Sequence, residues 1–488
     1  MREAIEGGQL NVLPGEMIYR IHLAIVEVLE KRGVQVEHMD ALKLLQDSGA
    51  EVDFGKLSVK IPQYLLEESI RKAPKSVRLA GRDSKNDFVL KGAKVHFRAC
   101  GLAPNVIDLE TGLRRESRLA DVRNGARLSD ALSEIDCANE VSAAKDVPSK
   151  LQGVYKQEAM MSNTTKHIIL AREHSADIES ERIKLAALVA GGEQRLRERP
   201  IVSMFVEPVS PLLLSLDDTA VIMKWAQAGL PLVCAPTPAS GGTAPITLAG
   251  TVVQGAAESL AGNVIAQLVN PGTPVIFGVL GLSMDMRNGL ITTGSIEGVL
   301  MCALLGQLAR YYRLPSIGFG GGSDSNALDS HAIAQACLGL NIAALSGINL
   351  VQGIGYLESG LTGSYEMLCI CDEIARMLRR FLKGVCVDDD TLGVEAITAI
   401  GPRQSFLGME HTRKHFLSEH MIPELMKSIP FGEWHKAGDK KLESRARDRV
   451  RQLLKDHYVQ PIDEGVQKDV ASLISSAEER YLGDHPRS

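Results

Sequence analysis

A glycine-rich segment followed by polar side chains is the part of this sequence best suited to chemistry. Residues 318–331 read GFGGGSDSNALDSH. Consecutive glycines allow the backbone to approach a ligand closely, and the side chains of Asp324, Asn326 and His331 can accept or donate hydrogen bonds. We therefore take these three as candidate catalytic residues.

Other interpretations of this segment stay open at the level of sequence. A glycine-rich loop at the end of a strand often binds phosphate through backbone N–H groups, and it can also be a lid without a ligand. Asp329 is equally suited to cap the helix that it precedes, and backbone groups of the same helix can satisfy His331.

Further polar and aromatic side chains follow other apolar runs. The segment 352–358, QGIGYLE, adds Gln352 to the candidate catalytic residues. The candidate substrate-binding residues are Arg98, Arg172, Glu207, Phe319, Tyr356, Glu358 and Tyr365. Tyr365 opens a predicted helix and is also suited to a place in the core.

The elements that must position these side chains are short apolar runs alternating with segments of helical period. The predicted strands are Val95–Ala99, Ile135–Asn139, His167–Leu170, Ile201–Val206, Pro231–Ala235, Pro274–Gly278, Pro315–Gly318 and Ile348–Val351. Their spacing of roughly 30 to 43 residues is that of βα units. The pattern favours a closed (β/α)₈ TIM barrel, an α/β fold, over an open doubly wound sheet. Active sites of such barrels lie at the carboxyl ends of the strands, where the candidates fall.

The segments on either side of the barrel differ from it. We predict an α-rich N-terminal region over 1–92, the catalytic barrel over 93–385 and a helical extension over 386–488. Within the extension, residues 388–400, 440–458 and 461–481 have helical patterns. The last two are charged and amphipathic, which predicts packing on the barrel surface or in a subunit interface. We expect a homo-oligomer.

Composition and charge exclude several classes of protein. The chain has 488 residues, 45% hydrophobic and 23% charged, which is ordinary globular usage and excludes a disordered chain. A net charge of -6 gives no reason to expect nucleic acid. Apolar runs are too short or too interrupted for a membrane span, and the first residues lack a signal-peptide core. We expect a cytoplasmic protein with no membrane partner, whose 8 cysteines, none in a CxxC pair, are reduced.

Signatures of several other enzyme classes are absent from the sequence. There is no GxxxxGK[ST] loop, no GxSxG elbow and no HExxH motif. His411 and His415 lie four residues apart, but this segment lacks the glutamate of a zincin and follows the barrel, so we predict no metal site. The absence of lysine between Lys224 and Lys383 disfavours an aldolase with a lysine nucleophile.

The glycine-rich segment resembles the trimethylamine methyltransferase (MttB) superfamily, and the resemblance spans nearly the whole chain. The residues that carry it, beyond 320–326 and Asp329, are Gln352–Gly353–Ile354–Gly355, His411–Thr412, His415–Phe416 and, near the start, Leu45, Gly49, Ala50, Val52 and Asp53. The resemblance implies a barrel enzyme that demethylates an amine and passes the methyl group to cobalt in a separate corrinoid protein.

One departure from the superfamily redirects the expected substrate. The archaeal trimethylamine enzymes carry pyrrolysine near the end of the seventh strand, and here the ordinary residue Asn326 stands at or near that place. The chain is therefore more similar to the non-pyrrolysine branch, which acts on quaternary amines such as glycine betaine. This similarity implies a glycine betaine–corrinoid protein Co-methyltransferase type of enzyme. It also implies no tightly bound cofactor, because the corrinoid (cobalamin) is carried by the cognate corrinoid protein.

The chemistry of a quaternary amine agrees with that assignment. Its leaving group is a neutral tertiary amine such as dimethylglycine, so no general acid is required, and the enzyme must position and desolvate the substrate. Aromatic faces hold such a cation at roughly 0.5–2 kcal/mol per contact. The expected cation wall is Phe319, Tyr356 and Tyr365 with Glu207, Glu358 or Asp324, and the expected carboxylate ligands are His331, Arg98, Arg172 and Gln352. Asn326 and Gln352 would orient the substrate.

Two other functions remain open. Another TIM-barrel enzyme, of the lyase or aldolase type, would need basic phosphate ligands or a lysine nucleophile near the last strands. A non-catalytic amine-binding barrel would bind an amine without turnover. Methyl transfer instead requires a barrel mouth open to a docked corrinoid protein, with a polar rim near the fifth, sixth and seventh loops.

Overall fold

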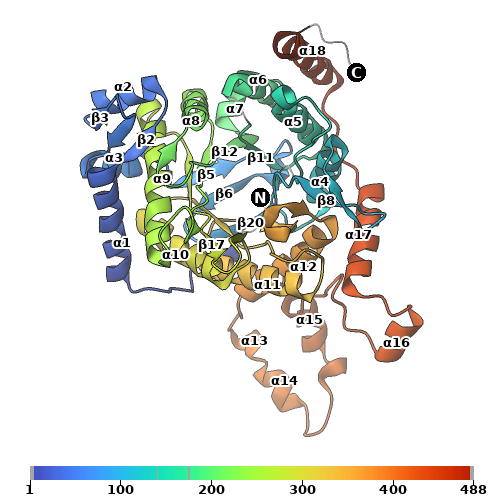
Figure 1. Ribbon diagram of the computed structural model, residues 1–488. Helices are drawn as coiled ribbons and strands as arrows, with labels where there is room; N and C mark the ends of the chain where they lie inside the picture. Colours follow the sequence, from blue (N-terminus) through green and yellow to red (C-terminus); the bar gives the residue numbers. More distant parts are fainter. Residues whose placement is uncertain (1–4, 140, 174–175, 484–488) are drawn as a thin grey trace.

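Eight parallel strands form a closed barrel in the computed structural model, which describes residues 5–139, 141–173 and 176–483 (Figure 1). The strands are β7 (Lys94–Ala99), β10 (Cys137–Asn139), β11 (His167–Ala171), β12 (Val202–Val206), β14 (Leu232–Cys234), β16 (Val275–Gly278), β19 (Ser316–Phe319) and β20 (Leu350–Ile354). Pairing of β20 with β7 closes the barrel. The TIM-barrel prediction is confirmed, and each predicted apolar run overlaps one barrel strand.

Alternate residues of each strand point into the barrel, because successive side chains of a strand face opposite ways. Inward-facing side chains from most of the strands share one buried cluster, which includes Cys137, Ile169, Phe205, Val233, Ile276, Ile317 and Leu350. The outward-facing side chains pack under the helices. Both faces are therefore buried, which explains why the strands read as continuous apolar runs.

A ring of helices surrounds the barrel (Figure 1). In chain order the main ones are α4 (Leu119–Ala131), α5 (Gln152–Asn163), α6 (Glu179–Ala190), α8 (Leu216–Ala228), α9 (Leu248–Val269), α10 (Ile296–Tyr312), α11 (Ser330–Leu345) and α12 (Tyr365–Leu382). Side chains cap several of them: Ser295 caps α10, Asp329 caps α11 and Ser364 caps α12. Each accepts a hydrogen bond from a backbone N–H of the first turn, which satisfies a donor that the helix leaves unpaired.

The N-terminal region covers part of the outside of the barrel and the end opposite the carboxyl ends of its strands. It contains α1 (Gly15–Glu27), α2 (Met39–Asp47) and α3 (Gln63–Lys72). Its strands β2 (Val34–Val36), β3 (Glu51–Asp53) and β4 (Ser58–Lys60) form a small sheet that β13 (Leu213–Leu214), from the segment after β12, joins beside β2. A hairpin of β5 (Ser76–Leu79) and β6 (Phe88–Lys91) supplies Val77, Leu79, Phe88 and Leu90 to the cluster inside the barrel. The hairpin thus fills the end opposite the carboxyl ends of the strands.

The C-terminal extension has two parts. The first is a lobe that projects from the barrel in Figure 1 and holds α13 (Asp389–Leu392), α14 (Val394–Ala399) and α15 (Glu410–Glu419). Residues 388–400, predicted as one helix, are divided at Gly393, whose φ of 64° lies in the left-handed region. The second part is α16 (Phe431–Lys436), α17 (Leu442–Asp456) and α18 (Glu464–Leu482), of which α17 packs on α12 and α4 and α18 packs on α6.

In the part of the chain that the structure describes, every helix is too short or too polar to cross a lipid bilayer.

Candidate active site

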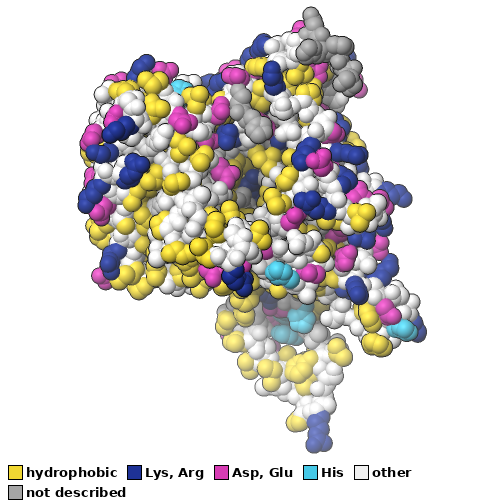
Figure 2. Space-filling model, in the orientation of Figure 1, with side chains coloured by type: hydrophobic (Ala, Val, Ile, Leu, Met, Phe, Trp, Pro, Cys, Tyr) yellow, Lys and Arg dark blue, Asp and Glu magenta, His cyan; other side chains and the backbone are white. Residues whose placement is uncertain are grey.

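A cavity of about 180 Å³ lies at the carboxyl ends of the barrel strands. Figure 2 shows a hollow in this face of the molecule. Five of the predicted site residues line the cavity: Arg98, Glu207, Phe319, Gln352 and Tyr356. They come from the ends of β7, β12, β19 and β20, or from the residues just after them, so closure of the barrel brings together positions up to 258 residues apart in the chain.

The cavity has one fixed cationic wall, formed by Arg98. Its Nη1 donates a hydrogen bond to Oε1 of Gln352, and both residues are buried. The guanidinium also lies over the ring of Phe205, with Cζ 5.0 Å from the ring centroid. A guanidinium held in this way is a preorganised ligand for a carboxylate.

An aromatic pair forms another wall. The rings of Phe319 and Tyr356 are stacked, with centroids 6.3 Å apart and planes inclined by 8°. The Tyr356 hydroxyl oxygen accepts a hydrogen bond from the backbone N–H of Gly101 at 3.0 Å. Burial raises the pKa of Tyr356, so the phenol stays neutral at physiological pH. The pair presents a rigid π surface to the cavity, the kind of surface that attracts a cation.

Glu207 supplies the negative charge. Its Oε1 accepts a hydrogen bond from the Thr237 hydroxyl at 2.5 Å. The Glu207 side chain is exposed to the cavity, and desolvation by the protein around its carboxylate raises its pKa above the ordinary value. Asp218 raises the pKa further, while Thr237, Arg172 and Arg98 oppose the shift.

The candidates chosen from sequence missed several residues that line the same cavity. Phe205, Thr237, Asn139 and Leu280 lie on it. The buried Oδ1 of Asn139 has no hydrogen-bond partner among the described residues, which makes Asn139 a further candidate for contact with a ligand in the cavity. Phe205 and Glu207 lie two residues apart at the end of one strand, so their side chains point to the same side, into the barrel. This alternation of side chains along a strand would have identified Phe205 from the sequence.

Three predicted substrate-binding residues are engaged with protein outside the cavity. Arg172 forms an ion pair with buried Asp218, at 2.5 Å between Nε and Oδ1. Glu358 pairs with Arg114 at 2.8 Å. Tyr365 is buried, and its hydroxyl donates to the backbone oxygen of Asp121 at 3.0 Å. The Tyr365 ring thus occupies the core position that the sequence left as an alternative.

Asp324 joins three loops at the barrel mouth. Its carboxylate accepts hydrogen bonds from the backbone N–H groups of Thr293 at 2.7 Å and Gly294 at 3.1 Å. It also accepts from Ser359 Oγ at 2.9 Å and Gln335 Nε2 at 3.1 Å. The loop after β19 is thereby fastened to the segments that follow β16 and β20. Asp324 holds the mouth in shape rather than facing the cavity.

Asn326 and His331 lie on the same side of the barrel but are exposed. Neither lines the cavity. Asp329, between them, caps α11 by accepting from the N–H of Ala332 at 2.9 Å. The segment thus presents Asn326 and His331 to solvent beside the mouth.

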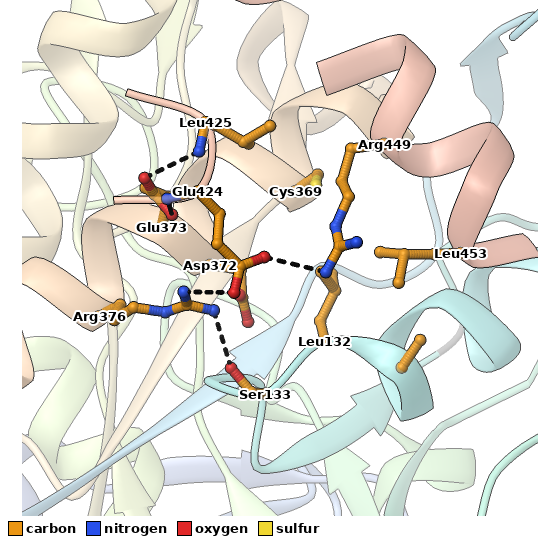
Figure 3. Close-up of a pocket in the computed structure, with 11 residues that line it drawn as sticks. Leu132, Ser133, Cys369, Asp372, Glu373, Arg376, Glu424, Leu425, Arg449 and Leu453 are labelled. Atoms are coloured by element: carbon orange, nitrogen blue, oxygen red, sulfur yellow. Dashed lines mark hydrogen bonds and ion pairs between the residues drawn. The ribbon is translucent and has the colours of Figure 1, made fainter. Parts of the chain in front are cut away.

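A second, smaller cavity of about 110 Å³ lies between α12, α17 and the segment around Glu424 (Figure 3). Its charged groups are paired with one another. Glu424 binds Arg376 at 2.6 Å and Arg449 at 2.9 Å, and Glu373 accepts backbone N–H groups of residues 424–426. These contacts attach the C-terminal extension to the barrel. The candidate active site is therefore the cavity at the carboxyl ends of the strands.

Comparison with known families gives a match over the length of the chain. A family model described as trimethylamine methyltransferase (MTTB) matches residues 3–480. The chain is 36% identical over 477 residues to a trimethylamine methyltransferase MttB of Desulfitobacterium hafniense (strain DSM 10664 / DCB-2), covering 98% of this chain and 96% of the relative. It is 32% identical over 454 residues to a glycine betaine methyltransferase of Desulfitobacterium hafniense (strain Y51), covering 92% and 93%.

A solved structure supports the fold independently. The monomethylamine methyltransferase (MtmB) of Methanosarcina barkeri superposes with a TM-score of 0.54, covering 93% of this chain and 89% of that one. The sequences are 14% identical, so this likeness concerns the fold alone.

Proposed function

The chain belongs to the trimethylamine methyltransferase (MTTB) family, and we propose that it moves a methyl group from a quaternary amine to the Co(I) corrinoid of a cognate corrinoid protein. The proposed substrate is glycine betaine or a similar betaine, and the released product is a tertiary amine such as dimethylglycine. Two observations support a betaine: one relative is named for glycine betaine, and the ordinary residue Asn326 stands at or near the place where the archaeal trimethylamine enzymes carry pyrrolysine.

The observation that carries the proposal is the charge pattern of the mouth. Arg98 and Glu207 line one cavity together with the stacked pair Phe319 and Tyr356. A betaine carries a carboxylate and a quaternary ammonium a few bonds apart. Arg98 with Gln352 suits the carboxylate, and Glu207 with the two rings suits the ammonium. A cavity of about 180 Å³ favours a small betaine.

In the proposed reaction the methyl group passes directly from the substrate nitrogen to cobalt. The C–N bond breaks with its electron pair remaining on nitrogen, and the methyl carbon accepts the electron pair of Co(I), which becomes methyl-Co(III). No proton is needed, because the leaving amine is neutral. Asn139 and Gln352 hold and orient the substrate, and the aromatic walls exclude water from the ammonium.

The rim of the mouth is the proposed docking place of the corrinoid protein. Asn326 and His331 are exposed beside the cavity, on a segment whose position Asp324 fixes. We assign them contact with the corrinoid protein during transfer, and we assign Asp324 the positioning of the loops. Because the partner would carry the corrinoid, the proposed reaction requires no cofactor pocket in this chain.

For the homo-oligomer we propose the C-terminal lobe as the contact surface and a second copy of this chain as its occupant. Figure 2 shows apolar surface on the lobe. The exposed large apolar side chains of this part of the chain are Val385, Val387, Leu392, Val394, Ile397, Leu407 and Leu417. The lobe follows the carboxyl end of α12, which begins at the mouth and ends at the other end of the barrel. A second copy can therefore cover this surface without obstructing the corrinoid protein.

The reaction is tested by mixing the purified chain with reduced corrinoid protein, or with free cob(I)alamin, and one candidate amine at a time. Appearance of the methyl-Co(III) absorption spectrum with glycine betaine, proline betaine, carnitine or γ-butyrobetaine identifies reaction and substrate together. Trimethylamine serves as the comparison substrate. Absence of the spectrum with every quaternary amine would contradict the proposal.

A further inference from the structure

Two histidines outside the barrel have no part in the proposed reaction. His411 and His415 lie four residues apart on α15, so they share one face of that helix. Their ring centroids are 4.6 Å apart. The sequence predicts no metal site there, because the segment lacks the glutamate of a zincin and follows the barrel.

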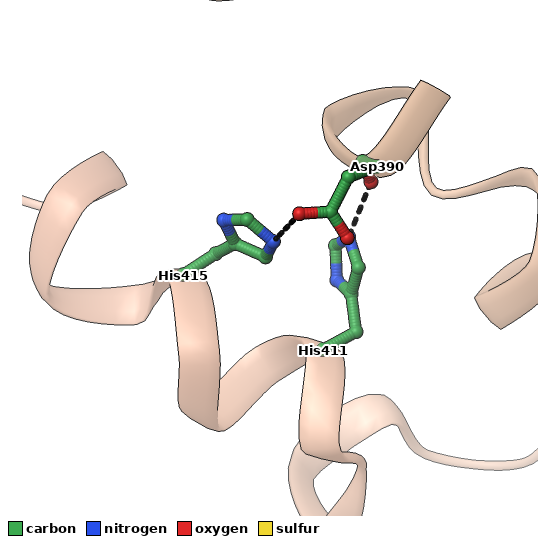
Figure 4. A group of neighbouring side chains, drawn as sticks. All are labelled: Asp390, His411 and His415. Atoms are coloured by element: carbon green, nitrogen blue, oxygen red, sulfur yellow. Dashed lines mark hydrogen bonds and ion pairs between the residues drawn. The ribbon is translucent and has the colours of Figure 1, made fainter. Parts of the chain in front are cut away.

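The structure supplies the third group from another helix. Asp390, on α13, lies against both rings (Figure 4). Nε2 of His415 is 3.1 Å from Oδ2 of Asp390, and Nε2 of His411 is 3.1 Å from the Asp390 backbone oxygen. One ligand atom from each of the three side chains lies within 4.8 Å of the other two. Among the described residues, this is the one group of three or more His, Cys, Asp or Glu side chains gathered so closely.

We propose that Asp390, His411 and His415 bind a divalent transition-metal ion of the Zn²⁺ type, with water as the fourth ligand. Two imidazole nitrogens and one carboxylate oxygen are preferred Zn²⁺ ligands, at about 2.0–2.2 Å from the ion in a tetrahedral arrangement. Such a tetrahedron places its ligand atoms about 3.3 Å apart by this geometry. Rotation of the three side chains, two of them anchored on one helix, brings them to that spacing.

The surroundings give a physical reason for a metal in this place. Helices α13, α14 and α15 have no buried residue among them, so the lobe lacks a hydrophobic core of its own. Segments without a core commonly depend on a disulfide or a metal for their order. An ion bound to Asp390 and to α15 would join two helices that are separated by 17 residues of chain, and it would stabilise the lobe.

Lys414 would compete with a metal ion for the carboxylate of Asp390. Its Nζ lies 2.6 Å from Oδ2 of Asp390, the same oxygen that contacts His415. The ammonium therefore neutralises the carboxylate when no metal is bound, and the ion must displace it. Removing this positive charge should strengthen metal binding, whereas it would weaken a cluster held only by hydrogen bonds and ion pairs.

The test is a titration of the full-length chain, stripped of metal, with Zn²⁺ against a chromophoric chelator. We expect one ion per chain. We expect at least about tenfold weaker binding in His411→Ala, His415→Ala and Asp390→Asn, by analogy with losses at other metal sites. Lys414→Gln should bind more tightly. His435→Ala is the matched control, because His435 contacts Asp439 at 3.0 Å and also lies four residues from its carboxylate partner.

Two further measurements do not depend on the folding of the variants. X-ray absorption of the zinc-loaded wild-type chain should show two imidazole nitrogens and oxygen ligands, and Zn²⁺ should slow proteolysis within the lobe. Substoichiometric binding by the wild-type chain overturns the proposal. So does binding that survives the double substitution of His411 and His415, or a coordination shell without imidazole. The assay needs neither amine nor corrinoid, so its result is independent of the proposed methyl transfer.

Discussion

The Arg98 guanidinium donates a hydrogen bond to the Gln352 amide oxygen at the place where β20 meets β7 and closes the barrel. Closure therefore does two things at once. It completes the sheet, and it fixes the direction of the one cationic side chain among the residues that line the mouth cavity.

Replacing Arg98 by Gln should raise the KM for a betaine about tenfold or more. A hydrogen bond to a charged group contributes about 1.5–3 kcal/mol, and the neutral amide loses the charge that holds the carboxylate. Steady-state kinetics with glycine betaine measure the effect. Tetramethylammonium, which has no carboxylate, is the control substrate, and an equal loss with it would contradict the assigned role.

Ionisation of Glu207 should make substrate binding depend on pH. The dependence should appear at higher pH than the titration of an ordinary glutamate. Burial raises its pKa from 4.5, and only the ionised carboxylate attracts the ammonium. Binding is therefore complete at higher pH and is lost as pH falls through the raised pKa. The pH profile of kcat/KM should show this loss, and Glu207→Gln should give a higher KM that no longer changes over the same range. An unchanged profile in the variant would assign the titration to another group.

The two substitutions of Tyr356 should separate its ring from its hydroxyl. Tyr356→Ala removes one aromatic wall and should weaken binding by about 0.5–2 kcal/mol, or roughly 2- to 30-fold. Tyr356→Phe keeps the ring and loses only the contact with the Gly101 N–H. We expect the Phe variant to retain most of the affinity in calorimetry or kinetics. Wild-type affinity in Tyr356→Ala would place the ammonium elsewhere.

Asn326→Ala and His331→Ala should slow transfer to the corrinoid protein while leaving the chain folded. Both side chains are exposed beside the mouth and do not line the cavity. Transfer to free cob(I)alamin should therefore be nearly unaffected. Parallel assays with the two methyl acceptors make the comparison. Equal slowing with both acceptors would instead support a direct contact with substrate.

Leu407→Asp should shift the assembly state toward the monomer. Leu407 is 88% exposed on the lobe, the highest exposure among the large apolar side chains. A carboxylate there would be costly in an apolar contact between two copies. Light scattering after size exclusion measures the mass. Leu113→Asp is the control, since Leu113 is 69% exposed on the turn between β8 (Asn105–Ile107) and β9 (Arg114–Glu116), away from the lobe. A wild-type monomer would reject the interface.

The local pattern of apolar runs and helical segments was sufficient to predict the barrel. Strands buried on both faces must be apolar throughout, so runs such as 201–206 stand out, and helices with capping residues such as Asp329 and Ser364 lie between them. The residues at the carboxyl end of each strand, or just after it, were also sufficient to find Arg98, Glu207, Phe319, Gln352 and Tyr356, because barrel topology alone places these positions at one end.

What the sequence could not determine is which charged groups are already paired inside the protein. Arg172 and Glu358 looked as suitable as Arg98 and Glu207, yet Asp218 and Arg114 engage them. Glu358 and Arg114 are 244 residues apart, and no local pattern links them. The spacing of His411 and His415 follows from helical period, but only the tertiary structure brings Asp390 to them. Periodicity is a property of neighbouring residues, whereas pairing of charges and gathering of ligands depend on how distant segments pack.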